Sequence, residues 1–273
     1  MRPGIFAKTF PGADPATVLR AVAAAGYSTA HWNWACAGLS SIPDTIPDGL
    51  SRQVRDAADA AGVDIVGVSA TWNMIHPDPA VRAAGQHGLR VIAAECDTLG
   101  TDLVTLCTGT RDPDDQWRAH EGNTTPAAWS DLRAELDKAL GTAEAHGIRL
   151  GIEPELANVV RDARSARRLL DEVADDRLAI VIDPANLFET AEPDEGRRLV
   201  TGAVDLLGGR IAMAHAKDRD ATGAVVPAGQ GVVDWDHYVA ALRQAGFDGP
   251  LVTHGLTAAE APAVARFLSG RLA

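Results

Sequence analysis

Residues 148–188, IRLGIEPELANVVRDARSARRLLDEVADDRLAIVIDPANLF, contain a complete strand–helix–strand pattern. Two short apolar runs, 148–153 and 178–183, flank an arginine- and leucine-rich segment, 161–174, that has helical spacing. Each apolar run ends in a carboxylate residue. Two strands that are joined through a helix pair in parallel, with a right-handed crossover. The stretch therefore predicts an α/β protein built on a parallel sheet.

The same alternation of strand and helix patterns continues along the whole chain. Further strand patterns lie at 4–8, 28–34, 64–70, 102–107, 210–216 and 250–254. Further helical patterns lie at 15–25, 49–61, 79–99, 127–146, 194–207, 235–245 and 257–270. Eight such units predict a (β/α)8 TIM barrel, and the lack of a linker-like segment predicts one domain over residues 1–273. An open doubly wound sheet would bring a glycine-rich phosphate loop after its first strand, and TFPGADP at 9–15 is not one.

The charge, hydropathy and cysteine content of the chain indicate which partners and which cellular location to expect. The chain has 25 Lys and Arg residues against 37 Asp and Glu residues, a net charge of −12, and no basic run. Such a chain repels a phosphate backbone, so no nucleic-acid partner is expected. No stretch approaches a membrane span, and the N-terminal MRPGIFAKTF has no apolar signal core. Three cysteines are too few for a disulfide framework, so we expect a cytoplasmic protein.

Four successive strand patterns end in residue types that bind metals: Glu153, Asp183, His215 and His254. Polar residues at the carboxyl ends of TIM-barrel strands point into one site. Each residue alone is readily explained as a helix cap or a loop residue, but the four together favour a shared cation, which offsets the cost of burying their charges. Two carboxylates and two imidazoles predict one divalent metal, Mn(II), Co(II), Fe(II) or Zn(II), rather than Mg(II), which prefers oxygen ligands.

Further polar residues follow the same strand patterns. Asn73 and His76 are candidates for orienting a hydroxyl and transferring a proton, or they form a helix-entry turn. Lys217 either stabilises a developing oxyanion or neutralises Asp218 or another acid. Glu155 either faces the site or forms a surface ion pair. The remaining candidates for substrate binding are Asn158, Asn186 and Arg111, the last for a phosphate or carboxylate.

From about residue 4 to 268 the chain resembles the sugar phosphate isomerase/epimerase family, the xylose isomerase-like TIM barrels that also include endonuclease IV-type repair enzymes. The motifs that carry the resemblance are FAKTFPG, HWNWACAGLSSIP, SATWNMIHPD, LCTGTRDPDDQW, GIEPELANVV, VIDPANLF, HAKD, GQGVVDW and LVTHGL. The resemblance implies one divalent metal, often manganese, at the mouth of the barrel. It also implies that Glu153, Asp183 and His215 take three of the four usual ligand positions.

Two residues depart from the family pattern. Many relatives end the eighth strand with a glutamate that is both a ligand and a second proton-transfer base, where this chain has His254. Asn186 stands where the more common pattern has a histidine, three residues after the aspartate. The metal site survives both changes on chemical grounds, but the two-glutamate epimerase mechanism does not carry over directly.

The predicted function is that of an isomerase or epimerase of a small sugar, sugar phosphate or related polyol-ketone. Glu153 is the expected base, which removes the proton next to a metal-polarised carbonyl and so forms a metal-stabilised enediolate. Epimerisation needs a proton donor on the opposite face, for which the candidates are His254, His76, Lys217 and Glu155. The lack of a glutamate at position 254 favours isomerisation, or an elimination that passes through the same enolate.

Two other functions stay open on the sequence alone. A barrel of this kind can be the partner-dependent subunit of a lyase, such as a C-glycoside-cleaving complex, and a co-purifying partner would reveal it. Phosphodiester cleavage of the endonuclease IV type needs several metals and a basic groove, and His31 and His76 are the only extra histidines near earlier strand ends. The expected partner is a small carbohydrate, and the sequence is compatible with a homo-oligomer.

Overall fold

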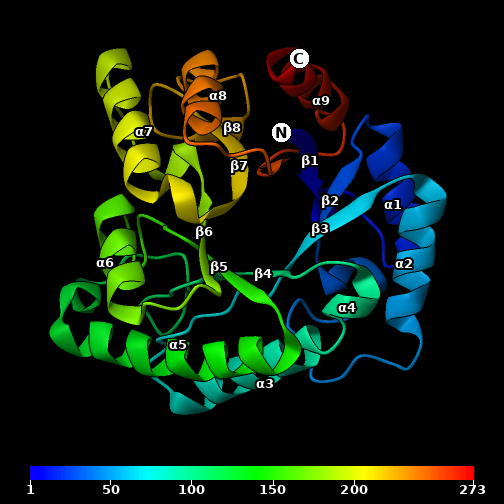
Figure 1. The fold of residues 1–273 in the computed structure, drawn as a ribbon, viewed down its shortest axis with the longest axis horizontal. Helices are drawn as coiled ribbons and strands as arrows, with labels where there is room; N and C mark the ends of the chain where they lie inside the picture. The colour runs from blue at the N-terminus through cyan, green and yellow to red at the C-terminus, as the bar shows by residue number, and fades with distance from the viewer.

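Eight parallel strands pair in a closed circle, which confirms the predicted TIM barrel. The computed structural model describes residues 1–273. Neighbours along the chain pair in order from β1 to β7, and β9 pairs with both β7 and β1 (Figure 1). The barrel strands are β1 (Arg2–Phe6), β2 (Thr29–Trp32), β3 (Asp64–Ser69), β4 (Leu103–Cys107), β5 (Arg149–Glu153), β6 (Leu178–Ile182), β7 (Ile211–Arg219) and β9 (Pro250–Thr253). The short β8 (Val225–Pro227) lies outside the barrel and pairs antiparallel with the end of β7.

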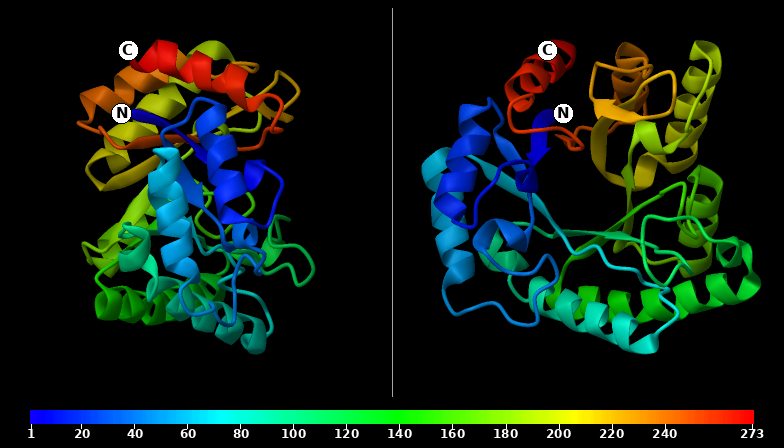
Figure 2. Two further views of the ribbon diagram at one scale, coloured as in Figure 1. Left: turned by 90° about the vertical axis from the view of Figure 1, so that its right-hand side faces the viewer. Right: turned by 180° about the vertical axis from the view of Figure 1, so that it is seen from behind.

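Helices surround the strands on the outside, as both views in Figure 2 show. They are α1 (Pro15–Ala24), α2 (Leu50–Ala61), α3 (Pro79–Ala93), α4 (Cys96–Leu99), α5 (Pro126–His146), α6 (Ala163–Val173), α7 (Pro193–Leu207), α8 (Trp235–Gln244) and α9 (Ala261–Leu272). A cluster of 63 buried apolar residues fills the space between helices and strands. None of these helices has the length and apolarity that crossing a bilayer requires.

The structure corrects two of the predicted helices. The pattern at 79–99 is divided into α3 and the single turn α4. The pattern at 257–270 begins later than predicted, at Ala261, because the Glu260 carboxylate accepts hydrogen bonds from the backbone N–H and hydroxyl of Thr257 and closes a separate turn. Side chains cap the N-termini of α1, α5 and α8: Asp14, Thr125 and Asp234 each accept a hydrogen bond from the backbone of the following first turn.

Two helical glycines allow a test of how tightly the helices pack on the barrel. A Cβ added to Gly85 in α3 would lie 2.1 Å from the Trp72 ring, whereas nothing lies within 4 Å of one added to Gly141 in α5. We expect Gly85→Ala to lower the free energy of unfolding by about 1–3 kcal/mol through overpacking. Gly141→Ala should raise it by about 0.5–1 kcal/mol, because alanine favours the helix. Urea denaturation of both variants checks this, and equal effects of the same sign would contradict it.

Candidate metal centre

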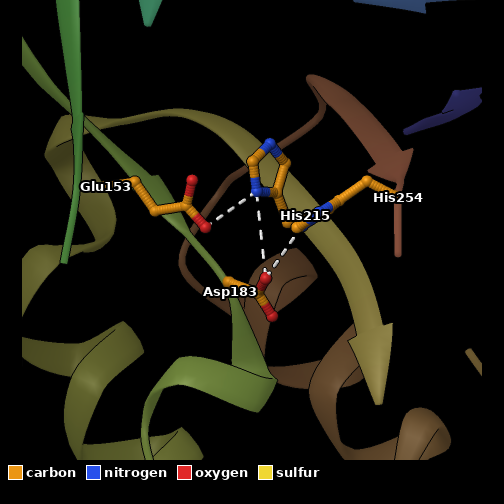
Figure 3. Close-up of side chains that lie close together, drawn as sticks. All are labelled: Glu153, Asp183, His215 and His254. Atoms are coloured by element: carbon orange, nitrogen blue, oxygen red, sulfur yellow. Dashed lines mark hydrogen bonds and ion pairs between the residues drawn. The ribbon is translucent and has the colours of Figure 1, made fainter. Parts of the chain in front are cut away.

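The four predicted ligand residues converge at the carboxyl end of the barrel (Figure 3). Glu153 ends β5, Asp183 directly follows β6, His215 lies in β7, and His254 directly follows β9. One ligand atom from each residue lies within 4.8 Å of the ligand atoms of the other three. Their side chains are between 0% and 22% exposed. The parallel strands therefore bring together residues that are about 100 positions apart in the sequence.

The donor atoms of the cluster point toward one another. His215 Nδ1 lies 3.0 Å from Glu153 Oε1 and 3.9 Å from Asp183 Oδ2. His254 Nε2 lies 3.1 Å from the same Asp183 oxygen. The centroids of the two imidazole rings are 4.5 Å apart. Two oxygen and two nitrogen donors at this spacing fit a mid-size divalent metal that accepts both carboxylate and imidazole ligands.

A buried lysine links the two carboxylates. Lys217 Nζ lies 3.0 Å from Asp183 Oδ2 and donates a 2.8 Å hydrogen bond to Asn186 Oδ1. The Asn186 amide in turn donates a 3.0 Å hydrogen bond to Glu153 Oε1. Two carboxylates and one ammonium leave the centre with a formal charge of −1, which is costly at this depth. This excess of negative charge attracts a cation, which supports the fit of a metal to the cluster.

The surroundings separate the pKa values of the two glutamates. Burial raises the pKa of Glu153, but the neighbouring His215 and Lys217 outweigh burial and hold it below its ordinary value. Burial and the nearby Glu153 carboxylate raise the pKa of Glu155 to about 8. Glu153 is thus held ionised, whereas Glu155 is mostly protonated at neutral pH. Two carboxyl groups in such different states can act as an acid and a base.

A cavity of about 290 Å³ opens beside the cluster and is lined by Glu153, Glu155, His215 and His254. The rest of its lining comes from the ends of β1 to β4 and the loops that follow them. A larger cavity, of about 600 Å³, lies at the opposite end, where the strands begin, and its charged side chains form ion pairs such as that of Arg149 with Asp102. Active sites of TIM barrels lie at the carboxyl end, so the smaller cavity is the candidate site.

Four predicted site residues lie outside both this cavity and the cluster beside it. Asn73 Oδ1 accepts from Thr110 N at 3.0 Å, and Asn158 Oδ1 accepts from Gly109 N at 2.7 Å. The other two side chains also bond within the protein: Arg111 pairs with Asp131, and His76 Nε2 lies 3.0 Å from the Pro113 carbonyl oxygen. All four hold the loop that follows β4. We therefore correct their predicted contact with the substrate to a supporting role.

That loop supplies residues that the sequence did not single out. Gln116 and Trp117 lie on it and line the cavity. At the cavity floor, His31 Nε2 lies 2.9 Å from the Thr105 hydroxyl, and both side chains are buried. His31 follows the rule that polar residues near the ends of barrel strands face the site, so that signal was present in the sequence. Gln116 and Trp117 carried no such signal, because they lie nine and ten residues beyond β4.

Asp218 also has an unpredicted role. Its neighbour Lys217 faces the cluster, and adjacent residues of a strand point to opposite sides. The buried Asp218 carboxylate accepts hydrogen bonds from the backbone N–H groups of Arg219, Gly229 and Val233 and from Trp235 Nε1, at 2.9–3.1 Å. It therefore does not pair with Lys217 but attaches the loop between β8 and α8 to the end of β7.

The fold and the cluster together define a class of protein, namely a TIM barrel with carboxylates and imidazoles gathered where its strands end. Residues 19–268 match the sequence model of the xylose isomerase-like TIM barrel family, and the chain belongs to that family. This confirms the resemblance seen in the sequence motifs.

Solved structures share the fold at low sequence identity. A D-tagatose 3-epimerase-like protein matches with a TM-score of 0.79 and 17% identity, over 100% of this chain and 97% of that chain. The IOLI protein, solved with a bound zinc atom, matches with a TM-score of 0.71 and 16% identity, over 98% and 96%. A xylose isomerase-like TIM barrel/4-hydroxyphenylpyruvate dioxygenase fusion protein matches with a TM-score of 0.72 and 18% identity, over 96% of this chain. The match covers 41% of the fusion protein, so this chain corresponds to less than half of its length.

Proposed function

We propose that this chain is a divalent-metal-dependent isomerase or epimerase that acts on a small sugar, sugar phosphate or related polyol-ketone. The observation that carries the proposal is the convergence of two carboxylates and two imidazoles beside a polar cavity of about 290 Å³. A cavity at the lower end of the usual range for ligand sites suits a small molecule. Solved relatives described as an epimerase-like sugar protein and as a zinc-binding protein support the same chemistry.

The proposed ligands are Glu153, Asp183, His215 and His254. Mn(II) is the metal we expect, with Co(II), Fe(II) and Zn(II) as alternatives. When bound, such a metal supplies Lewis acidity that polarises the carbonyl group of the substrate. Lys217 holds Asp183 in place and adds a positive charge beside the cluster, which favours the negative charge that develops on the substrate.

Glu153 is the proposed base. Its Oε1 atom is engaged by His215 and by the Asn186 amide, whereas its Oε2 atom has no protein partner. The side chain lines the cavity and is held ionised, so Oε2 is free to accept the proton from the carbon next to the carbonyl. Asn186 orients this carboxylate by its hydrogen bond to the other oxygen.

Glu155 is the proposed proton donor. Of the four candidates from the sequence, His76 lies outside the cavity, His254 is engaged with Asp183, and the Lys217 ammonium bonds to Asp183 and Asn186. Glu155 is the one candidate that both lines the cavity and forms no ion pair. A carboxyl group there returns a proton from a position distinct from that of Glu153. Glu155 therefore takes the place of the glutamate that many relatives carry at the eighth strand.

Metal content tests the proposal first. Protein purified without chelator should hold close to one equivalent of Mn, Co, Fe or Zn by elemental analysis. His254→Ala removes one ligand and should weaken the metal affinity by at least about 100-fold, more than the loss of an outer-shell partner does. His237→Ala is the matched control, because His237 lies on α8 and bonds to Thr201 rather than to the cluster. A wild type that holds no metal and gains none on titration would contradict the proposal.

We also propose that residues 1–273 form one domain and that the substrate is the only partner the reaction requires. The large cluster of 63 buried apolar residues, to which residues from the first to the last barrel strand contribute, supports one domain. Co-purification of a second, stoichiometric protein that is needed for turnover would instead favour the partner-dependent lyase.

A further inference from the structure

The far part of the cavity is lined by side chains that donate hydrogen bonds. Lys8 lies in the short 3-10 helix η1 (Ala7–Thr9) after β1, Asn33 directly follows β2, and Ser41 lies in the next loop. All three line the cavity that Glu153 and His215 line from the other strands. A substrate bound at the metal cluster therefore lies in the same cavity as these three residues.

Lys8 is the one lysine of this chain without a carboxylate partner. The chain has three lysines. Lys138 Nζ lies 2.9 Å from Glu135, and Lys217 Nζ lies 3.0 Å from Asp183. The only contact of the Lys8 ammonium is a 3.4 Å hydrogen bond to the Ser41 hydroxyl. Lys8 is also the only lysine or arginine that lines the cavity, in a chain whose net charge is −12.

Asn33 is held so that its amide nitrogen is free. Its Oδ1 atom accepts hydrogen bonds from Ala35 N and from the Ser41 hydroxyl, both at 3.0 Å. These two bonds fix the orientation of the amide group, and its Nδ2 atom has no protein partner although the residue is only 3% exposed. The Nδ2 atom is not among the buried atoms of the chain that lack a partner, so it is open to the cavity, where water or a ligand can accept its hydrogen bonds. The free hydrogen-bonding capacity of Lys8 and Asn33 thus consists of N–H donors.

We propose that Lys8 and Asn33 bind an anionic group of the substrate, a carboxylate or a phosphate ester. Such groups carry only acceptor oxygens on the anion and match a donor-only surface that holds one positive charge. A neutral hydroxyl would leave the Lys8 charge unpaired. The inference rests on the proposed function, which places the reacting carbons of the substrate at the metal cluster. The anionic group of the same substrate then lies in the part of the cavity that Lys8 and Asn33 line.

Binding constants for three six-carbon ketoses test the inference. D-fructose is neutral, D-fructose 6-phosphate carries a phosphate, and D-fructuronate carries a carboxylate. We expect the metal-loaded full chain to bind at least one of the two anions about tenfold or more tightly than fructose, by calorimetry or by quenching of the tryptophan fluorescence. In Lys8→Met the ratio of anion to fructose affinity should fall toward one, and Lys8→Arg should keep most of it. The preferred anion identifies the substrate class.

Lys138→Met is the matched control, because it removes the same charge from a lysine on α5 that pairs with Glu135. The inference would be overturned if neither anion bound more tightly than fructose, or if the ratio of anion to fructose affinity were unchanged in Lys8→Met. These results are separable from the proposed function. If no ketose is turned over but the Lys8-dependent preference is present, the anion site stands and the isomerase proposal fails. If neutral sugars are turned over without any Lys8 effect, only the anion site fails.

Discussion

Replacing Glu153 with glutamine is expected to lower turnover by about 10³-fold, within the range that general acid–base catalysis supplies. An amide has no basic oxygen that can take the proton from carbon, although it keeps an oxygen that can bind a metal. The hydrogen bond from Asn186 to Oε1 can also persist, because that atom accepts in both side chains. The loss should therefore appear in kcat even when metal is supplied in excess.

Proton exchange separates this role from metal binding. The hydrogen next to the carbonyl of a bound ketose should exchange with D2O in the wild type and not in Glu153→Gln, as NMR would show, with metal content measured on the same samples. Glu155→Gln is the matched control. It should keep the exchange that Glu153 catalyses but lower epimerisation, because the proposed proton donor is lost. An active, metal-loaded Glu153→Gln variant would remove Glu153 as the base.

Asp218→Ala is expected to lower the free energy of unfolding by about 3–5 kcal/mol. The carboxylate has no exposed surface and accepts four hydrogen bonds, three from backbone N–H groups and one from Trp235. Its removal leaves these donors without partners, and each buried donor that is left unpaired costs about 1–3 kcal/mol. Partial rearrangement and entry of water reduce the sum.

Chemical denaturation followed by circular dichroism measures this effect. Asp220→Ala is a suitable control, because Asp220 also accepts backbone hydrogen bonds, in the turn between β7 and β8, but is only partly buried. We expect its loss to be about 1 kcal/mol or less, since water replaces the carboxylate there. A loss below about 1 kcal/mol for Asp218→Ala would show that the loop between β8 and α8 is held by other contacts.

Most of the barrel could be predicted from the sequence because strand and helix periods differ so clearly. The strand predicted at 148–153 is β5 (Arg149–Glu153), and the one at 178–183 is β6 (Leu178–Ile182). Boundaries were less accurate where side chains in turns compete with the helix. Glu260, which closes its own turn with Thr257, delays the start of α9.

The four-residue cluster could be predicted because each of its members lies at or near the carboxyl end of a barrel strand, where the fold class alone gives its direction. The loop residues could not be predicted in this way. Asn73 and Asn158 also follow strand ends, four residues after β3 and five after β5, but they bond to the backbone of the loop after β4. These two side chains satisfy buried backbone N–H groups instead of facing the cavity. No local sequence pattern indicates which of the two a loop residue does.

The sequence by itself determined the barrel, its family and the four residues that gather at its carboxyl end, because periodicity and strand direction are local properties. Only the tertiary structure decided which side chains meet across the barrel. Closure between β1 and β9 places Lys8 and Asn33 in the same cavity as Glu153, more than a hundred residues away. The pairing of β6 with β7 brings Lys217 to Asp183, and Lys217 bonds there rather than to the adjacent Asp218. These pairings depend on distances between elements that are far apart along the chain, and therefore on the packing of the whole barrel.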